Sequence, residues 1–172
     1  MRALPRTAFA LLLTLPLLAS QATADMLAIF TEGAPKDRFT LLNTGPCAIT
    51  EASVLIDIST ARGKLIFDVT DQGAGVQVFQ PFEIVTGADA LAGLPEVLDG
   101  QSALRLNIVS LAAGAEIAFT IDVDDTLGQR ETTVSGSEID GATLALTRGA
   151  DSLTAGFSQD ARATLLFSGC TS

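Results

Sequence analysis

Apolar and polar residues alternate along short stretches of this chain, and clusters of Gly, Asp, Asn, Thr or Pro separate the stretches. The alternation is clearest at residues 117–123, and it recurs at residues 52–58 and 65–69. A period of two is typical of a strand with one buried face. Weaker stretches predict further strands at residues 26–30, 38–43, 76–82, 104–108, 132–135, 142–147 and 163–168.

Residues 87–100 interrupt this rhythm with glycines and Pro95, and they predict a loop with one helical turn. About nine to ten short strands, separated by turns, indicate one all-β domain, an antiparallel β-sandwich or jelly roll. The alternation also predicts which residues face the core. These are Ala52, Val54, Ile56, Leu65, Phe67, Leu106, Ile117, Phe119 and Ile121.

The first 24 residues have the pattern of a cleaved secretory signal. Arg2 and Arg6 give a basic start, residues 8–18 are apolar, and Ala22-Thr23-Ala24 is a small-x-small cleavage site. A membrane anchor is the alternative, but the apolar stretch is too short to span a bilayer. We therefore expect a signal at residues 1–24 and a β-sandwich domain at residues 25–172. The domain would be exported to the periplasm or the extracellular space, with no transmembrane anchor after cleavage.

Composition narrows the possible functions. The chain has a net charge of −10, which disfavours binding to nucleic acids or to anionic lipid headgroups. It has no His, so Ser-His-Asp catalysis and imidazole metal sites are excluded. A glycosidase with two carboxylates stays possible, although Trp and Tyr, which commonly stack on sugars, are also absent. We therefore predict that the protein is not an enzyme.

Cys47 and Cys170 are the two cysteines of the chain, and both follow the predicted signal. An even number of cysteines in an exported protein predicts a disulfide, with two free buried thiols as the alternative. The bond would join the last strand to the N-terminal part of the sandwich. In the chain-entropy model such a long loop contributes roughly 4–5 kcal/mol of stability.

The densest group of carboxylates lies at the end of the clearest strand, at Asp122, Asp124 and Asp125, and Asp125 falls where the strand gives way to a turn. On a strand, Asp122 and Asp124 point to the same face, with Cα atoms roughly 6.5–7 Å apart. We expect these three residues to form a weak Ca²⁺ site, because Ca²⁺ takes about six to eight oxygen ligands. Asp99 or Asp68 is a candidate for a further ligand from a neighbouring loop.

The alternative to a cation site is a solvated acidic strand end. A second alternative is that Arg105 or Arg130 neutralises the carboxylates.

Phe79 and Pro81 mark a candidate contact edge. Phe79 falls on the opposite side from Val78 and Phe82, and Pro81 has no amide donor, which is typical of an edge strand or a bulge. The alternative is a second core layer that covers Phe79.

Three stretches, at residues 32–39, 75–82 and 119–126, resemble short exported bacterial proteins called aggregation factor core proteins, after the core of the marine-sponge aggregation factor. The resemblance extends from about Phe30 to Gly136. It implies a role in calcium-dependent adhesion.

These observations favour a non-catalytic extracytoplasmic binding or adhesion module, assisted by Ca²⁺, whose partner is a protein or a saccharide at the cell surface. One alternative is a cell-envelope enzyme that uses two carboxylates on a saccharide. A second is a structural envelope or matrix subunit that pairs through a sheet edge.

Overall fold

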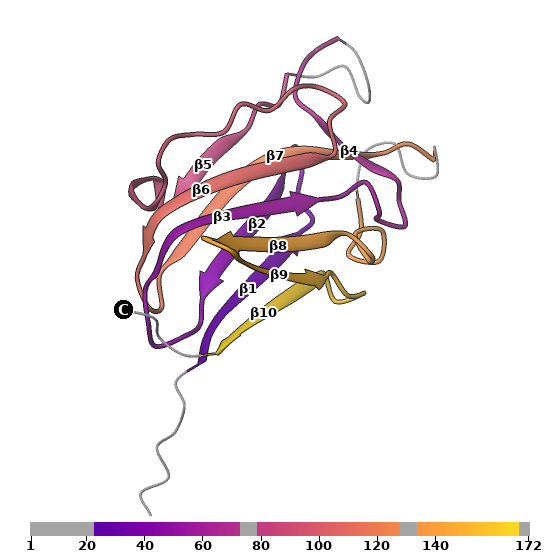
Figure 1. Ribbon diagram of the computed structural model, residues 1–172. Coiled ribbons are helices and arrows are strands. Elements are labelled where there is room, and N and C mark those ends of the chain that lie inside the picture. Colours follow the sequence, from indigo (N-terminus) through magenta and orange to yellow (C-terminus); the bar gives the residue numbers. More distant parts are fainter. Residues whose placement is uncertain (1–22, 73–78, 128–133, 169–172) are drawn as a thin grey trace, which may run out of the picture.

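The structure, a computed structural model, describes residues 23–72, 79–127 and 134–168, and in these residues the chain forms two antiparallel sheets (Figure 1). The strands are β1 (Thr23–Thr31), β2 (Asp37–Asn43), β3 (Ile49–Asp57), β4 (Leu65–Asp68), β5 (Glu83–Thr86), β6 (Ala103–Leu111), β7 (Glu116–Asp125), β8 (Thr143–Arg148), β9 (Asp151–Gly156) and β10 (Arg162–Ser168). A single 3-10 turn, η1 (Ala88–Ala90), lies in the predicted loop. The predicted all-β sandwich is confirmed.

The larger sheet has the strand order β10-β1-β2-β7-β4, and β5 also pairs with β7. The smaller sheet has the order β6-β3-β8-β9. Strand β7 is the longest, and three strands pair with it: β2 with residues 116–121, β5 with residues 118–120 and β4 with residues 122–125. The end of β7 therefore passes beyond the β2 ladder and keeps only β4 as its partner.

The core lies between the two sheets, and an aromatic cluster occupies part of it. The ring of Phe39 on β2 lies within 5.1 to 6.5 Å, between centroids, of Phe30, Phe67, Phe119 and Phe157. Residues that alternate along the strands supply this core, as expected for period-two patterning. All the residues that the alternation predicts to be buried are buried.

The strand prediction is wrong in three places. Residues 79–82 are not a strand, and β5 follows them instead (the preceding residues 73–78 lie outside the described part). Val134 and Ser135 are not in a strand either, and residues 128–133 lie outside the described part. Strand β9 is missing from the prediction. Both β5 and β9 are short and largely exposed, so the burial that produces a visible alternation does not act on them.

Candidate metal centre

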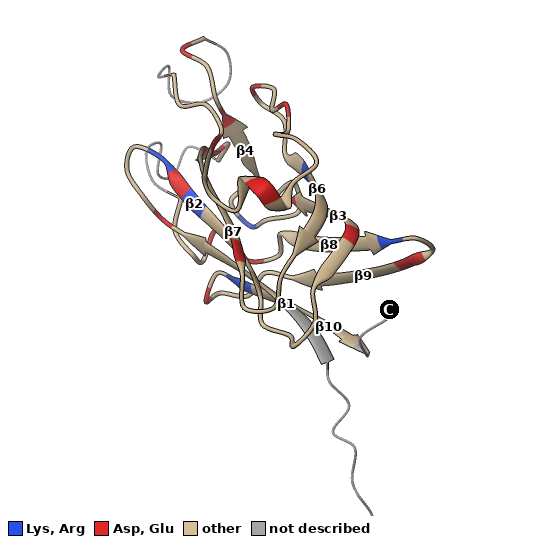
Figure 2. Cartoon of the chain, turned by 90° about the vertical axis from the view of Figure 1, so that its left-hand side faces the viewer, with Lys and Arg blue, Asp and Glu red and all other residues tan. Residues whose placement is uncertain are grey.

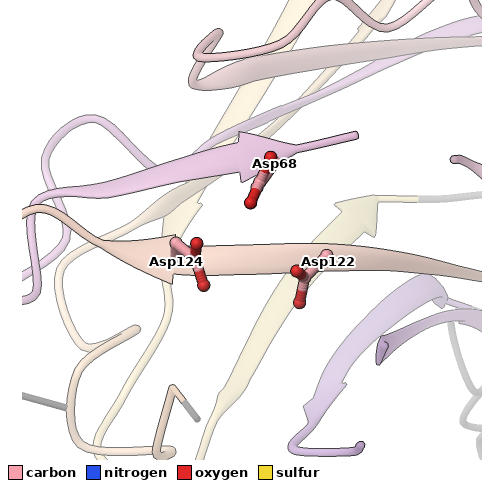
Figure 3. A group of neighbouring side chains, drawn as sticks. All are labelled: Asp68, Asp122 and Asp124. Carbon is pink, nitrogen blue, oxygen red and sulfur yellow. The ribbon is translucent and has the colours of Figure 1, made fainter. Parts of the chain in front are cut away.

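The end of β7 and the end of β4 bring three aspartates together, namely Asp68, Asp122 and Asp124, which we call the aspartate triad (Figure 3). Asp68 on β4 is the register partner of Asp122 on β7, and Asp124 pairs with Ile66. Side chains of paired residues share a face of the sheet, and so do residues two apart on one strand. The predicted common face of Asp122 and Asp124 therefore also carries Asp68.

The carboxylates of the aspartate triad are close together and shielded from solvent. One oxygen from each lies within 4.8 Å of the others. The exposed fractions are 0% for Asp68, 8% for Asp122 and 4% for Asp124. The cluster is thus not the solvated acidic strand end that the sequence left open.

Asp125 lies outside this group. It is half-exposed, and its Oδ1 accepts a hydrogen bond of 3.0 Å from the Leu127 amide, which closes the turn after β7. Asp99 is near the aspartate triad: its Oδ1 accepts hydrogen bonds from the Val69 and Thr70 amides, directly after Asp68. The structure thus places Asp68 in the group, and it places Asp125 at the last position of β7, beside the turn that follows.

Burial and nearby carboxyl groups make Asp68 and Asp122 hard to ionise. Burial first, and then the neighbouring carboxyl groups of Asp99 and Asp124, raise the pKa of Asp68 from its usual 3.8 to about 7. Burial and the charge of Asp124 raise the pKa of Asp122 to about 6, although the Val123 amide and Lys36 oppose the rise.

Asp37, which sequence analysis did not single out, extends this acidic region at the start of β2. Its Oδ1 accepts a hydrogen bond from the Gly33 amide, and its Oδ2 accepts one from the Val123 amide, where the β2–β7 ladder ends. Burial, and to a lesser extent the charge of Asp122, raise the pKa of Asp37 to about 7. The two hydrogen bonds lower the pKa but do not cancel this rise.

Two polar side chains at the aspartate triad have atoms with no hydrogen-bond partner. Both carboxylate oxygens of Asp68 are fully enclosed and accept no hydrogen bond. Gln80 is buried and donates from Nε2 to Asp122 Oδ2 at 3.0 Å, while its Oε1 has no donor. Sequence analysis missed Gln80, because a single amide between Phe79 and Pro81 gives no signal of burial.

Among the described residues, neither Arg105 nor Lys36 supplies the missing partners. Arg105 lies on β6 in the other sheet and donates to Ser53. Arg130 lies outside the described residues. Lys36 forms an ion pair of 2.6 Å with Glu83 and donates to the Pro81 carbonyl. Neither Asp68 nor Asp122 forms a salt bridge with a described residue.

Phe79 is 67% exposed, so no second core layer covers it. With Pro81 and Phe82 it lines one side of a groove of about 310 Å³, and Val69, Leu94 and Val97 contribute to the rest of the lining. Among the lining residues, Val69 follows Asp68 directly in the chain, and Phe79 and Pro81 are the neighbours of Gln80.

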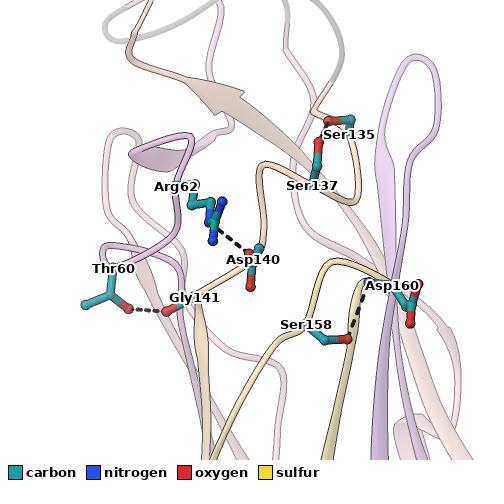
Figure 4. A network of polar contacts seen from close by, with 8 residues as sticks. All are labelled: Thr60, Arg62, Ser135, Ser137, Asp140, Gly141, Ser158 and Asp160. Carbon is teal, nitrogen blue, oxygen red and sulfur yellow. Dashed lines mark hydrogen bonds and ion pairs between the residues drawn. The ribbon is translucent and has the colours of Figure 1, made fainter.

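A second polar region joins the loops at one end of the sandwich (Figure 4). Arg62 and Asp140 form an ion pair of 2.8 Å, and Thr60 donates to the Gly141 carbonyl. Ser135 Oγ lies 2.9 Å from Ser137 Oγ, in the turn before β8. These groups pair with one another, as expected for contacts that fix loops.

The predicted disulfide and the predicted signal involve residues outside the described part of the chain. Cys47 is half-buried in the turn before β3, and its carbonyl accepts a hydrogen bond from Asn43. Cys170 lies outside the described residues, as do residues 1–22, so the disulfide and the signal stay predictions. Among the described residues, no helix has the length and apolar character needed to cross a membrane.

Comparisons with known proteins do not assign this chain to a family. No family model matches it, and no curated protein matches it significantly. Among solved structures it is similar to the carbohydrate-binding module CBM3b from the cellulosomal cellobiohydrolase 9A of Clostridium thermocellum. That match covers 77% of this chain and 94% of the module, at 13% identity and a TM-score of 0.33. A TM-score this low carries no information about a ligand of the present chain.

Proposed function

We propose that this protein is a non-catalytic, exported binding module that binds Ca²⁺ at the aspartate triad. The observation that carries the proposal is the convergence of three buried carboxylates within 4.8 Å, one of which, Asp68, accepts no hydrogen bond. Buried charges in proteins are paired or coordinate metals, because an isolated buried carboxylate is strongly disfavoured. A divalent cation would neutralise the repulsion that raises the pKa values of Asp68 and Asp122.

The ligand atoms favour Ca²⁺ over other cations. All three residues offer oxygen, which suits hard cations, and softer metals prefer nitrogen or sulfur. Mg²⁺ demands a near-ideal octahedron, whereas Ca²⁺ accepts irregular sets of about six to eight oxygens. Three side chains fixed on two paired strands cannot adjust freely, so the more tolerant ion fits better.

The setting supports a role outside the cytoplasm. The chain is acidic, and Asp and Glu recur over its loops and strand ends (Figure 2). Ca²⁺ sites of extracellular modules have dissociation constants of about 10⁻⁴–10⁻³ M. The resemblance to aggregation factor core proteins supports adhesion as the task, with a protein or a saccharide at the cell surface as partner.

The aspartate triad is poorly suited to glycosidase chemistry. In glycosidases the two carboxyl groups lie about 5–9.5 Å apart and flank a sugar. Here the side chains are buried, so a sugar ring has no room between the carboxylates. A structural subunit that pairs through the exposed edge strand β9 is a second candidate, since an edge with free backbone groups can add another strand.

Thermal unfolding of the exported protein tests the proposal. The chain has no Trp or Tyr, so circular dichroism or calorimetry is the suitable measurement. With a dissociation constant of about 10⁻⁴ M, 10 mM Ca²⁺ would stabilise the fold by about 2.7 kcal/mol, and Tm would rise by several degrees relative to EDTA. The Asp124→Asn variant should lose this rise, and the matched control Asp125→Asn should keep it. A wild-type Tm that is equal in Ca²⁺ and EDTA would overturn the proposal.

A further inference from the structure

Gln80 connects the aspartate triad to the exposed groove beside it. Its side chain is only 8% exposed, and Nε2 donates to Asp122 Oδ2 at 3.0 Å. Its neighbours in the chain lie outside: Phe79 is 67% exposed, and Pro81 lines the groove. The enclosed Oε1 of Gln80 accepts no hydrogen bond, and an unsatisfied buried acceptor is destabilising.

We propose that Gln80 Oε1 is a fourth protein ligand of the Ca²⁺ ion, and that Ca²⁺ thereby fixes residues 79–82 and the groove that they line. This inference rests on the proposed function of the aspartate triad. It adds a ligand that is not a carboxylate, and it gives cation binding an effect on the surface of the protein.

The carboxamide of Gln80 can serve both contacts at once. Nε2 holds the amide plane against Asp122, which orients Oε1, and amide oxygens are common Ca²⁺ ligands. A ligand whose second atom is held by a hydrogen bond is preorganised for the metal. Because the amide is neutral, it adds a ligand without adding to the repulsion among the carboxylates.

Residues 79–82 contact the rest of the protein through Phe82 and Pro81 at one end and through the Gln80 side chain near the other. At the first of these ends, the Phe82 ring packs on Phe119 at 4.9 Å between centroids, and Lys36 Nζ donates to the Pro81 carbonyl at 3.2 Å. At the other end, Phe79 is largely exposed, and within residues 79–80 the buried side chain is that of Gln80.

The opposite side of the groove is also attached to the acidic region. Val69 and Thr70 line the groove, and their amides donate to Asp99 directly after Asp68 in the chain. Both sides of the groove therefore begin at residues in or beside the aspartate triad. A cation that draws Asp68 and Gln80 together would set the distance between the two sides.

A fluorescent side chain on the groove tests this inference. Because the chain has no Trp, the Phe79→Trp variant carries a single indole there. Its emission should change on Ca²⁺ titration, with the midpoint that calorimetry gives for binding. Adding Gln80→Leu should abolish the emission change and weaken Ca²⁺ binding about tenfold. Adding Asp125→Asn instead should leave both unchanged.

The outcomes separate this inference from the proposed function. If Ca²⁺ raises the Tm of the protein but the indole emission of the Phe79→Trp variant stays constant, the link to the groove is wrong and the cation site stands. If the variant that combines Phe79→Trp with Gln80→Leu still shows the full emission change with Ca²⁺, the link to the groove is likewise wrong and the cation site stands. If Gln80→Leu does not fold, Gln80→Glu keeps an oxygen ligand and should show a larger Ca²⁺-induced rise in Tm than wild type; an unchanged rise would contradict the role of Gln80 as a ligand. If Ca²⁺ neither binds nor raises Tm, the proposed function itself fails.

Discussion

Asp68 and Asp122 face each other as register partners across strands β4 and β7, and both carboxylates are buried. Like charges in directly opposed positions destabilise a sheet, and burial makes their repulsion stronger. A sequence selected only for stability would place apolar side chains here, as it does at the partners Phe67 and Val123. The opposed pair therefore points to a function that needs the charge.

Replacing one member of the pair should stabilise the cation-free protein. The Asp68→Asn variant lacks a buried carboxylate whose oxygens accept no hydrogen bond. In EDTA we therefore expect the Tm of this variant to exceed that of wild type. The same variant should lose most of the rise in Tm with Ca²⁺, because a ligand has lost its charge. Thermal unfolding by circular dichroism in EDTA and in 10 mM Ca²⁺ measures both effects. A variant that is less stable than wild type in EDTA would contradict the repulsion argument.

Without a cation, the protein should lose stability as the pH rises. Asp37 and Asp68 have pKa values of about 7 in the folded state and an ordinary value of 3.8, so the folded protein holds protons that the unfolded chain releases. The free energy of unfolding should therefore fall between pH 4 and 7, by up to about 1.4 kcal/mol for each unit of pKa difference per group. Thermal unfolding in EDTA from pH 4 to 8 measures this.

Ca²⁺ should reverse that loss above pH 7 and have little effect near pH 5, where protons occupy the carboxyl groups of Asp68 and Asp122. In Asp68→Asn the pH dependence should be shallower than in wild type. A cation-free stability that increases steadily from pH 5 to 8 would contradict the raised pKa values.

The aromatic cluster should contribute strongly to stability. Phe119 is fully buried and stacks on Phe39 at 5.3 Å between centroids, so Phe119→Ala should cost about 3–5 kcal/mol in urea unfolding. Phe79→Ala is the matched control, because that ring is 67% exposed and should change stability by less than about 0.5 kcal/mol. Similar losses in the two variants would contradict the assignment of Phe79 to the surface.

Cys47 and Cys170 should form a disulfide in the exported protein. We expect no thiol to react with a labelling reagent in the unfolded, unreduced protein, and two to react after reduction. Replacing both cysteines by Ser should lower stability by up to about 4–5 kcal/mol. Two reactive thiols before reduction would contradict the bond.

Cleavage between Ala24 and Asp25 is a further expectation from the sequence. Strand β1 starts at Thr23, and cleavage would leave the β1–β10 ladder intact from the pair Asp25 and Leu166 onward. The intact mass of the exported protein measures the cleavage point. A mature protein that retains residues 1–24 would contradict the export prediction.

The sequence predicts the buried strands well and the edge strands poorly. Strands β3, β6 and β7 have a core face, and that face produces the alternation at Val54, Leu106 and Phe119. Strands β5 and β9 bury little side-chain surface, so their residues follow no such pattern. Backbone pairing holds them in place, and backbone pairing is not visible in residue types.

The candidate site was predictable only within one strand. Alternation places Asp122 and Asp124 on one face, but the sequence does not give the register that brings Asp68 opposite Asp122. Asp125 continues the acidic run, and its side chain accepts a hydrogen bond from the turn after the strand. Gln80 reaches the site from a segment without secondary structure, so no periodicity could have identified it.

Strand β1 lies between β2 and β10, so the first strand of the sheet is completed by the last one. Strand β1 therefore gains its second partner only after residues 162–168 have been synthesised. Until then β1 exposes a row of unpaired backbone groups, to which another chain can add. A chain shortened before Arg162 would move the edge of the larger sheet from the seven-residue strand β10 to the longer strand β1, and so lengthen the edge on which another chain can pair.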